Sequence, residues 1–514
     1  MPLSASLANA PRSHGFLQRL VLTGLVFTLL VSCAASAQVD LRVDWSQLGI
    51  PTKTVITLQV VENPPLMRGS AIHDNAWKAL RELQSDKTRL ALWYPYPRLA
   101  VAELAPPTEY ATSWDFSQID PIVEDFFAAT ENRASVFTMS TIPTWMFKQA
   151  DPGPVPPNPA EVMWGYEAGD ELRDPSGKEV ADYYARVAQW YTQGGFKDEL
   201  GKTFASLHRY KIAYWEVLNE PEYEHALSID TYIRLYDKVS AAVRQVSPET
   251  RFVGMSLAEP TRSPESFERF LNPANHAPGT PLDAISYHFY AVPEPGESDE
   301  VQQYTFFTRA DAFLNSVRYI ESIRKRLSPG TETQINEVGC IAAGDLGQGP
   351  DSMTRVPSAQ YWSLCGAMFA YLYAGLAEQG IDAVGASQLV GYPTQFPSVS
   401  LLDWNTGLPN ARYRVLELLH KNFGPGDRPV KVSYKSSDVF VAAYVSGTGE
   451  KKILLVNKRN HDAVVQLAGL SGATEEDVDV RTGGGTIASR RLNADQVSLG
   501  PFAVSVVTLP PAAQ

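Results

Sequence analysis

Cysteine is scarce in this chain, and so are the residue patterns that hold metals. The 514 residues include three Cys and eight His, none of which stand at the spacings typical of zinc sites. Apart from Cys33 near the N-terminus, only Cys340 and Cys365 remain. A chain of this length does not need disulfides to fold. The sequence therefore predicts no metal site, and it leaves open whether Cys340 and Cys365 form a bridge or two buried thiols.

Basic charge is also in short supply. Lys and Arg number 44 against 57 Asp and Glu, the formal net charge is −13, and the basic residues form no long run. Nucleic acid needs a basic surface to meet its phosphates, so it is excluded as a partner. Neutral polymers and small sugars remain. Aromatic residues make up 11% of the chain, with ten Trp, which suits sugar binding and suits a rich core equally well.

Long apolar runs are missing outside the N-terminal segment. There, Arg12 and Arg19 precede the apolar run Leu20–Val31, and Ala35-Ser36-Ala37 follows as a small-residue cleavage site. The run is shorter than the roughly 18 residues of a membrane span and is typical of a secretory signal. We therefore expect a signal peptide over residues 1–37, no membrane span, and an exported protein that is periplasmic or extracellular.

The same segment has a second interpretation. Leu30-Val31-Ser32-Cys33 resembles a bacterial lipobox, in which Cys33 is acylated and becomes the mature N-terminus. The sequence leaves both outcomes open: cleavage after Ala37 releases a free protein, and acylation of Cys33 anchors the protein to lipid.

Short β-rich runs alternate with amphipathic helical stretches from about residue 54 to residue 422. In one such stretch Ile233, Tyr236, Val239 and Val243 recur at intervals of three or four residues, which marks one helix face. Eight β/α units predict a (β/α)8 TIM barrel, here placed over residues 38–425. The predicted strands are Thr54–Val61, Arg89–Trp93, Ser135–Met139, Ala213–Leu218, Arg251–Met255, Ala284–His288, Thr333–Asn336 and Ala383–Leu389. The predicted helices include Ile119–Thr130, Glu179–Tyr191, Asp230–Val246, Ala310–Leu327, Ser358–Glu378 and Ala411–Lys421.

The pattern changes after Gly424-Pro425-Gly426. Short strands follow one another between Gly, Asn and Ser turns, without a helical stretch, which predicts a small all-β sandwich over residues 426–514. Val39–Val43 can add a strand to it. We expect this domain to pack on the barrel and stabilise it rather than to bind carbohydrate. Its predicted strands are Val430–Tyr434, Val439–Val445, Lys452–Asn457, Ala463–Leu467 and Ala503–Leu509.

Two glutamates stand at the ends of predicted strands. Glu220 follows the strand Ala213–Leu218 and precedes Pro221, and Glu337 follows the strand Thr333–Asn336. Catalytic groups of parallel barrels project from these strand ends. Hydrolysis of a glycosidic bond with retention needs a carboxylic acid and an ionised carboxylate about 5–5.5 Å apart. We assign Glu220 as the acid/base and Glu337 as the nucleophile, on the fourth and seventh strands, which face each other across the mouth.

Three segments carry a resemblance to a known group of enzymes. Trp215–Pro221, Asp283–Tyr290 and Ile335–Gly339 resemble the strand-four, strand-six and strand-seven segments of the clan A glycoside hydrolases. With its C-terminal β-domain, the chain after residue 50 is most similar to glycoside hydrolase family 39, which includes β-xylosidases and α-L-iduronidases. The resemblance implies a retaining glycosidase with a barrel and a sandwich.

The resemblance also implies a sugar-binding set around the two glutamates. It places His288 and Tyr290 near the nucleophile and the sugar, although His288 can equally be a strand-end histidine that faces the barrel interior. Asn219 is suited to bond the sugar 2-hydroxyl. The family often has Arg-x-His on strand two; this chain keeps Arg89, which we include in the sugar-binding set, and lacks the His.

A second departure lies at strand eight, where the clan places a Trp and this chain has Ser387-Gln388-Leu389. Both departures bear on the identity of the sugar more than on the reaction. Trp93 and Trp145 are further candidates to stack on a sugar ring, with core packing as the alternative for each. Glu216 is expected to form an ion pair inside the barrel.

Two more acidic residues, Glu222 and Glu224, are expected to be solvated loop charges. Together these features predict an exo-acting retaining glycoside hydrolase for plant or microbial oligosaccharides or polysaccharides. It works by double displacement without a metal or organic cofactor. The alternatives are an endo-acting clan A enzyme of another family and a catalytically silent carbohydrate-binding protein. The sugar, the linkage, the anomeric configuration and the oligomeric state do not follow from the sequence.

Overall fold

The computed structural model describes residues 37–149, 151, 153–167, 169–345, 356–392 and 396–510. The predicted signal peptide, up to residue 36, and the lipobox cysteine Cys33 lie outside the described residues, so both remain predictions. Within the described ranges, no helix combines the length and apolar character needed to cross a membrane.

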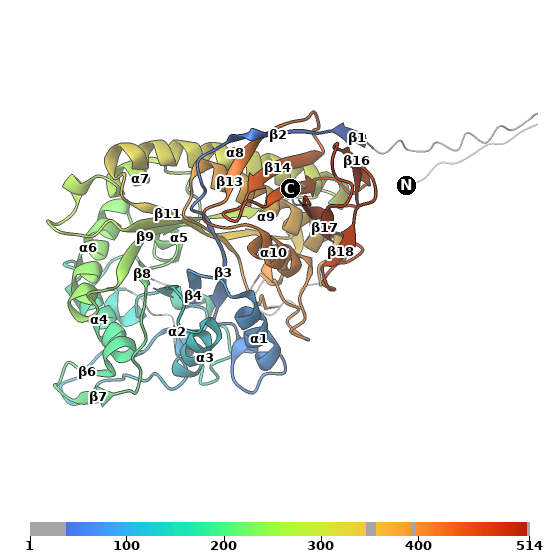
Figure 1. Ribbon diagram of the computed structural model, residues 1–514. Helices are drawn as coiled ribbons and strands as arrows, with labels where there is room; N and C mark the ends of the chain where they lie inside the picture. The colour runs from blue at the N-terminus through green and yellow to red at the C-terminus, as the bar shows by residue number, and fades with distance from the viewer. Residues whose placement is uncertain are drawn as a thin grey trace, which may run out of the picture. The chain divides into compact units, whose positions relative to one another are not determined.

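Eight parallel strands close into a barrel in the order β10-β11-β12-β3-β4-β5-β8-β9 (Figure 1). Each corresponds to one of the eight strands predicted from the sequence, so the predicted fold class is confirmed. Strands β4, β5 and β8 are buried on both faces, as expected where helices cover a parallel sheet. The bounds are β3 (Val55–Val61), β4 (Thr88–Leu92), β5 (Ser135–Met139), β8 (Tyr214–Val217), β9 (Arg251–Leu257), β10 (Ala284–Ala291), β11 (Glu332–Cys340) and β12 (Ala383–Ala386).

Helices fill the connections between the barrel strands, and their ends follow local chemistry. At the start of α6 the Ser228 side chain accepts a hydrogen bond from the backbone N–H of Thr231, and at the end of α4 Gly194 adopts a left-handed conformation with φ of 78°. The main helices are α1 (His73–Leu83), α3 (Asp120–Thr130), α4 (Lys178–Gln193), α6 (Ile229–Val246), α8 (Asp299–Leu327), α9 (Ala359–Gln379) and α10 (Ala411–Asn422). The shorter elements are α2 (Pro97–Ala100), α5 (Pro221–Glu224), α7 (Glu265–Phe270), β6 (Gly195–Lys197) and β7 (Thr203–Ala205).

Helix α8 differs from its prediction at one end. It begins at Asp299 rather than at Ala310. Its first turns bury Gln302 and Gln303, so the apolar repeat that reveals a helix starts only farther along the chain.

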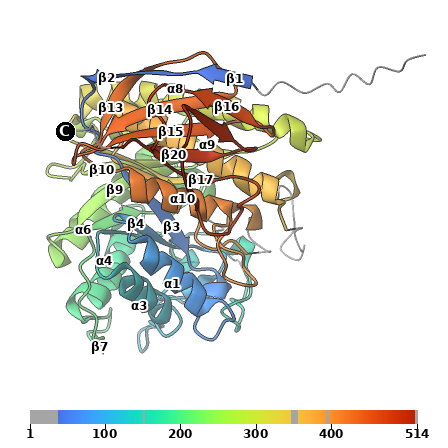
Figure 2. The same cartoon turned by 45° about the vertical axis from the view of Figure 1, so that its right-hand side comes forward.

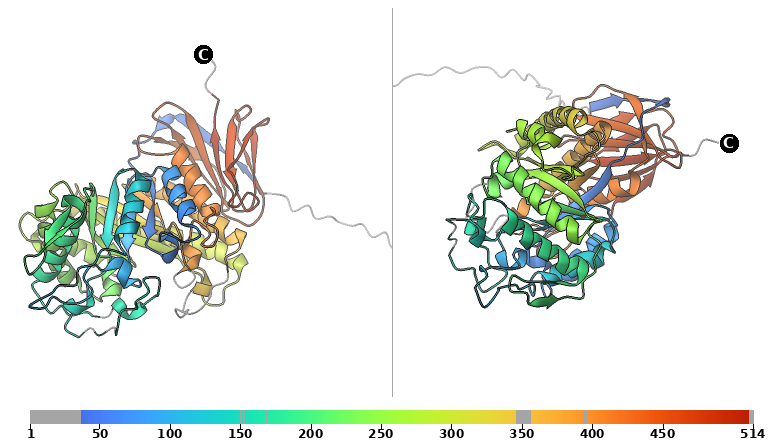
Figure 3. Two further views of the ribbon diagram at one scale, coloured as in Figure 1. Left: turned by 90° about the horizontal axis from the view of Figure 1, so that it is seen from below. Right: turned by 90° about the vertical axis from the view of Figure 1, so that its left-hand side faces the viewer.

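Two sheets form the C-terminal sandwich, which is mostly orange to red in Figure 3: an antiparallel sheet in the order β18-β17-β20-β15-β14-β13-β2 and a mixed sheet in the order β1-β16-β19, in which β1 runs parallel to β16. The apolar core between them includes Val39, Val441, Leu455 and Val497. The predicted strands are present, and three further ones, β17, β18 and β19, are added. The bounds are β1 (Ala37–Asp40), β2 (Arg42–Leu48), β13 (Arg428–Ser433), β14 (Val439–Val445), β15 (Lys451–Asn457), β16 (Ala463–Gln466), β17 (Thr474–Val478), β18 (Ala488–Arg491), β19 (Gln496–Leu499) and β20 (Val504–Thr508).

The predicted start of the barrel domain at residue 38 is corrected. β1 pairs with β16 and β2 pairs with β13, so both strands belong to the sandwich, and the barrel begins with β3. The expectation that Val39–Val43 adds to the sandwich is therefore confirmed. Both ends of the described chain contribute to one domain because a sheet edge accepts any strand that can pair with it.

The sandwich packs on the barrel helices α9 and α10, as expected (Figure 2). Lys421 at the end of α10 forms an ion pair with Glu476 of β17 at 2.5 Å, and Asn422 donates to the same carboxylate at 3.2 Å. The rings of Tyr371 in α9 and Phe440 in β14 meet edge to face at 4.9 Å. These contacts fix the sandwich against helices α9 and α10.

A disulfide joins Cys340, the last residue of β11, to Cys365 in α9, with their Cα atoms 6.0 Å apart. The sequence left open whether these cysteines form a bridge or two buried thiols, and the structure shows the bridge. It ties the strand that carries Glu337 to the helix that covers it.

Replacing both cysteines, as Cys340→Ala with Cys365→Ala, should lower the free energy of unfolding by about 3 kcal/mol, because the bridge limits the unfolded chain. Urea unfolding of the wild type and the variant measures the loss. Thiol titration of the wild type in denaturant without reductant should detect neither cysteine. Two reactive thiols at these positions would contradict the bridge.

Candidate active site

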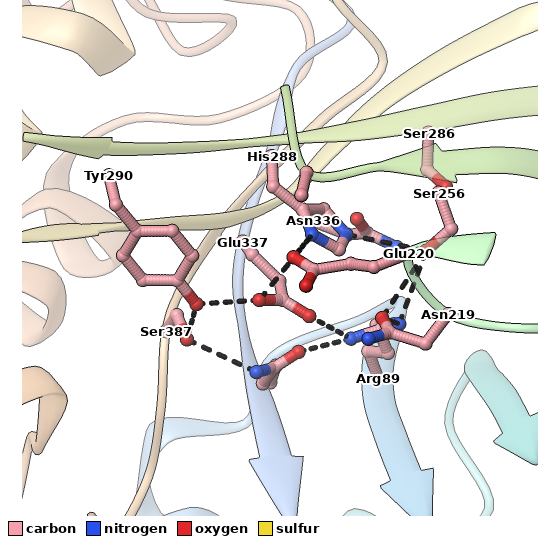
Figure 4. A network of polar contacts seen from close by, with 12 residues as sticks. Arg89, Asn219, Glu220, Ser256, Ser286, His288, Tyr290, Asn336, Glu337 and Ser387 are labelled. Atoms are coloured by element: carbon pink, nitrogen blue, oxygen red, sulfur yellow. Dashed lines mark hydrogen bonds and ion pairs between the residues drawn. The ribbon is translucent and has the colours of Figure 1, made fainter. Parts of the chain in front are cut away.

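Glu220, just after β8, and Glu337, in β11, lie side by side at the mouth of the barrel (Figure 4). A carboxylate oxygen of one lies within 4.8 Å of a carboxylate oxygen of the other. Both line a cavity of about 330 Å³, together with residues from the ends of most barrel strands. Ligand pockets span about 300–1,000 Å³, so this cavity suits a small ligand or one end of a longer one.

An extra residue in β11 turns Glu337 into the barrel. Gln334 pairs in register with β10, but the register has shifted by one residue at Glu337, and the same extra residue appears against β12. Consecutive side chains of a regular strand point to opposite faces, and a bulge relieves this constraint. Both Asn336 and Glu337 therefore reach the interior, where Asn336 donates to Glu216 at 2.7 Å and Glu337 accepts from Arg89 at 2.6 Å.

A left-handed turn positions Glu220. Leu218 and Glu220 have φ angles of 65° and 39°, a region that residues other than glycine rarely occupy. The turn ends β8, and Pro221 then starts the short helix α5. The backbone N–H of Glu220 donates to the Ser256 carbonyl at 3.0 Å, which holds the turn against β9. Such outliers cluster at functional sites, where the surrounding structure holds them.

The floor of the site is the buried carboxylate of Glu216. It accepts hydrogen bonds from Arg89 at 2.5 Å, Thr138 at 2.8 Å and Ser286 at 2.5 Å, besides the one from Asn336. Burial alone would raise the pKa of Glu216, but the charge of Arg89 and the hydroxyl donors outweigh it, so the pKa lies below its usual range. The ion pair expected inside the barrel is present.

Arg89 joins this floor to the site above it. Its Nη1 donates to Glu337 and Gln59, and its Nη2 donates to Asn219 at 2.6 Å. The side chain is 0% exposed and its donors are used within the protein. The prediction that Arg89 binds the sugar is therefore corrected: it holds Glu337 and Asn219 from below.

His288 lies between the two glutamates. Its Nδ1 is 2.7 Å from Glu220 and 3.6 Å from Glu337, and its Nε2 is 3.3 Å from the Ser256 hydroxyl. Burial lowers the pKa of His288, but the charge of Glu337 and the bond to Glu220 outweigh it, so the pKa is raised. The second oxygen of Glu337 accepts a hydrogen bond from the Tyr290 hydroxyl at 2.5 Å.

The atoms of Glu220, His288 and Glu337 are close enough together to hold a metal ion. These three groups are better suited to hold a proton between them than to bind a metal ion. The raised pKa of His288 favours an imidazolium, which has no lone pair for a metal, and the guanidinium of Arg89 already neutralises Glu337.

The predicted tryptophans have different places. Trp93 lines the cavity beside Asn219 and Glu220. Trp145 does not line it: its indole N–H donates to the Glu103 carbonyl at 2.8 Å, and Arg173 stacks on its ring at 4.5 Å. The prediction that Trp145 contacts the sugar is therefore corrected. It lies on the chain after β5 at a second cavity.

Glu222 and Glu224 are not the solvated charges that the sequence suggested. Glu224 is buried and accepts hydrogen bonds from the Asn219 amide at 2.8 Å and the Trp93 indole at 2.9 Å. Glu222 accepts from the backbone N–H of Ala258 at 2.7 Å, and burial raises its pKa to about 7. The sequence offered one signal that Glu224 lies near the site. It follows Glu220 by four residues, and residues at this spacing are neighbours on one face of a helix, here the helix that begins at Pro221.

Sequence reasoning missed Gln59 of the first barrel strand, whereas it had already placed Ser387 and Gln388 at the end of the eighth, where the sugar would bind. Gln59 of β3 and Gln388 after β12 line the cavity, and the Ser387 hydroxyl is 2.6 Å from that of Tyr290. Gln59 also donates to Ser387 at 3.1 Å. Gln59 sits in an apolar run, where one polar side chain is a signal of an inward position. The signal for Ser387 and Gln388 was the resemblance, because they stand where the clan places a Trp.

No protein-family model matches the chain, and no curated protein matches it. Solved structures share its fold over nearly its whole length. The GH51 arabinofuranosidase from Xanthomonas axonopodis pv. citri is similar with a TM-score of 0.63 and 12% identity, over 92% of this chain and 100% of that chain. The α-L-arabinofuranosidase from Thermotoga maritima gives a TM-score of 0.58 and 14% identity, over 92% and 99%. A GH30 endoxylanase from Clostridium papyrosolvens C71 gives 0.54 and 13%, over 92% and 100%.

Arg89→Met should lower the free energy of unfolding by about 3–5 kcal/mol, because it leaves the carboxylates of Glu216 and Glu337 buried without their cation. Urea unfolding measures the loss. As a matched control, Arg326→Met removes a surface pair with Glu268 whose side chains are about half exposed, and should cost less than about 1 kcal/mol. Equal losses in the two variants would contradict the buried network.

The stability that His288 contributes should depend on pH. Its folded pKa is raised above the ordinary value of about 6.5, so the contribution is complete below that value and is lost as the pH rises through the higher folded pKa. Urea unfolding should therefore separate the wild type from His288→Gln more at pH 6 than at pH 9. The exposed His461→Gln should show no such difference. A gap that widens toward pH 9 would contradict the assignment.

Proposed function

We propose that this protein is a retaining glycoside hydrolase in which Glu337 is the nucleophile and Glu220 is the acid/base. One observation carries the proposal: the carboxylates of Glu220, after β8, and Glu337, in β11, approach within 4.8 Å at one cavity. Retaining enzymes hold their carboxyl groups about 5–5.5 Å apart, whereas inverting enzymes leave about 6.5–9.5 Å for a water molecule.

The surroundings of Glu337 suit a nucleophile. Its oxygens accept hydrogen bonds from Arg89 and Tyr290, which hold the carboxylate in one orientation, and the residue is 6% exposed. In the first step one oxygen of Glu337 bonds to the anomeric carbon while the glycosidic bond breaks. The product of this step is a covalent glycosyl-enzyme.

Glu220 suits the acid/base role because it is the more open of the two. Its side chain is 23% exposed, and it faces the cavity with the His288 Nδ1 as a hydrogen-bond partner. In the first step it gives its proton to the departing oxygen. In the second step it takes a proton from water, whose oxygen bonds to the anomeric carbon and releases Glu337.

The substrate of this proposal is a carbohydrate. The similar structures include an arabinofuranosidase and an endoxylanase, and their shared fold supports a sugar-processing site of this kind. The small cavity favours exo action on the end of an oligosaccharide or polysaccharide. The proposal also places the chain near glycoside hydrolase family 39, on the likeness of three sequence segments. It further includes export of the protein, with either a free N-terminus or one anchored to lipid through Cys33.

Each of the two glutamates can be tested on a panel of aryl β-xylosides, β-galactosides, β-glucosides, α-L-arabinosides and uronides. Glu220→Ala should lower kcat by about 10²–10⁴-fold, with a smaller loss when the leaving group needs no proton. Glu337→Ala should lower it at least as far with every leaving group. The exposed Glu265→Gln is the control and should match the wild type. Full activity in either alanine variant would overturn the assignment.

Covalent labelling separates an enzyme from a carbohydrate-binding protein without turnover. A 2-fluoro glycoside of the preferred sugar, with a good leaving group, should attach to Glu337, because the fluorine slows both steps and the good leaving group speeds only the first, so that the covalent intermediate accumulates. Peptide mass mapping locates the label. A protein that binds the sugar but never becomes labelled would be the silent alternative.

A further inference from the structure

A third carboxyl group touches the two cavity residues next to Glu220. Glu224 is the last residue of α5 and is 4% exposed. Its Oε1 accepts hydrogen bonds from both Asn219 Nδ2 and Trp93 Nε1, at 2.8 and 2.9 Å. Asn219 and Trp93 line the cavity, whereas Glu224 itself does not. The group is therefore placed to act on the cavity through two neighbours.

The surroundings of Glu224 favour its neutral form. Among the described residues, no lysine or arginine forms an ion pair with it, and burying a lone carboxylate is costly. Burial raises the pKa of Glu224 well above its usual range, and the charges of Glu220 and Glu337 raise it further. An indole and an amide nitrogen only donate, so in the neutral form of Glu224 the accepting Oε1 is the carbonyl oxygen and Oε2 carries the proton.

The hydrogen bonds around Asn219 fix which way its amide faces. Its Oδ1 accepts from Arg89 Nη2 at 2.6 Å, and a guanidinium can only donate. Its Nδ2 must then face Glu224, where one hydrogen is used at 2.8 Å. The second hydrogen of Nδ2 remains for a group in the cavity beside Glu220. Arg89 and Glu224 thus hold the amide from its two ends.

We propose that Glu224, as a neutral carboxylic acid, is a positioning residue that orients the Asn219 amide and the Trp93 indole toward the sugar in the transition state. The inference rests on the proposed glycosidase function. In that function the free N–H of Asn219 bonds the sugar 2-hydroxyl, a contact that strengthens as the transition state forms. A neutral acceptor orients these donors without adding a negative charge beside the ionised Glu337 and the acid/base Glu220.

Substitutions at Glu224 separate orientation from charge. Glu224→Gln keeps the acceptor and is neutral at every pH, so it should turn over the preferred aryl glycoside at close to the wild-type rate. Glu224→Ala removes the acceptor and should lower kcat/KM by about 10- to 100-fold, since small misplacements of aligned groups cost this much. Glu224→Met, which keeps the length of the side chain, should behave like Glu224→Ala and serves if that variant folds poorly. The exposed Glu249→Ala is the control and should match the wild type.

A substrate without the 2-hydroxyl tests whether the effect passes through Asn219. The loss in Glu224→Ala or Glu224→Met should shrink markedly on the 2-deoxy glycoside, because that substrate cannot use the misplaced amide. A purely structural role would lower stability in thermal unfolding and leave the loss equal on both substrates. Equal losses would overturn the proposal.

The glutamine variant supplies a second decisive result. If Glu224→Gln falls as far as Glu224→Ala while the wild type is active, a neutral acceptor is not what the site needs, and the proposal is wrong. These outcomes differ from a failure of the proposed function, in which the wild type hydrolyses no glycoside and is not labelled at Glu337. In that case the role of Glu224 in turnover falls as well.

Discussion

A single buried cation, Arg89, links the interior of the barrel to its mouth. It bonds Glu216 on one side, Glu337 on another and Asn219 on a third, and none of its side chain is exposed. One guanidinium can satisfy several acceptors at once because its five donors lie in a rigid plane. The buried negative charges of Glu216 and Glu337 are tolerable only with this partner, so the position of every polar group above it depends on Arg89.

The strands that bring groups to this cation are irregular at the places that matter. The bulge in β11 lets Asn336 and Glu337 both face inward, and the left-handed residues Leu218 and Glu220 end β8 in a tight turn. A regular strand would have sent either Asn336 or Glu337 outward. The closed barrel tolerates these irregularities, because the remaining strands stay paired while a few residues near the mouth depart from the regular hydrogen-bond ladder.

Much of the architecture follows from local patterns. The eight barrel strands and the main predicted helices were recognisable because apolar residues recur with the period of the element that they form. The misses have physical causes. The start of helix α8 was missed because its first buried residues, Gln302 and Gln303, are polar and break the apolar repeat. Strand β18 was missed because it is short, largely exposed and ends in Arg490 and Arg491, so it has few apolar residues. In the site, Trp145 and Arg89 were chosen for residue type, but burial and existing partners removed both from the cavity.

The sequence by itself determined the kind of elements, their order, and the two glutamates near the mouth ends of β8 and β11, because hydrophobic period and position along a strand are local properties. Only the tertiary structure decided which polar groups surround those glutamates. Glu224 became a buried neighbour of Asn219 instead of a solvated charge, and β1 and β2 joined the sandwich instead of the barrel. Burial and pairing depend on what the rest of the chain brings to the same place, and no local pattern contains that information.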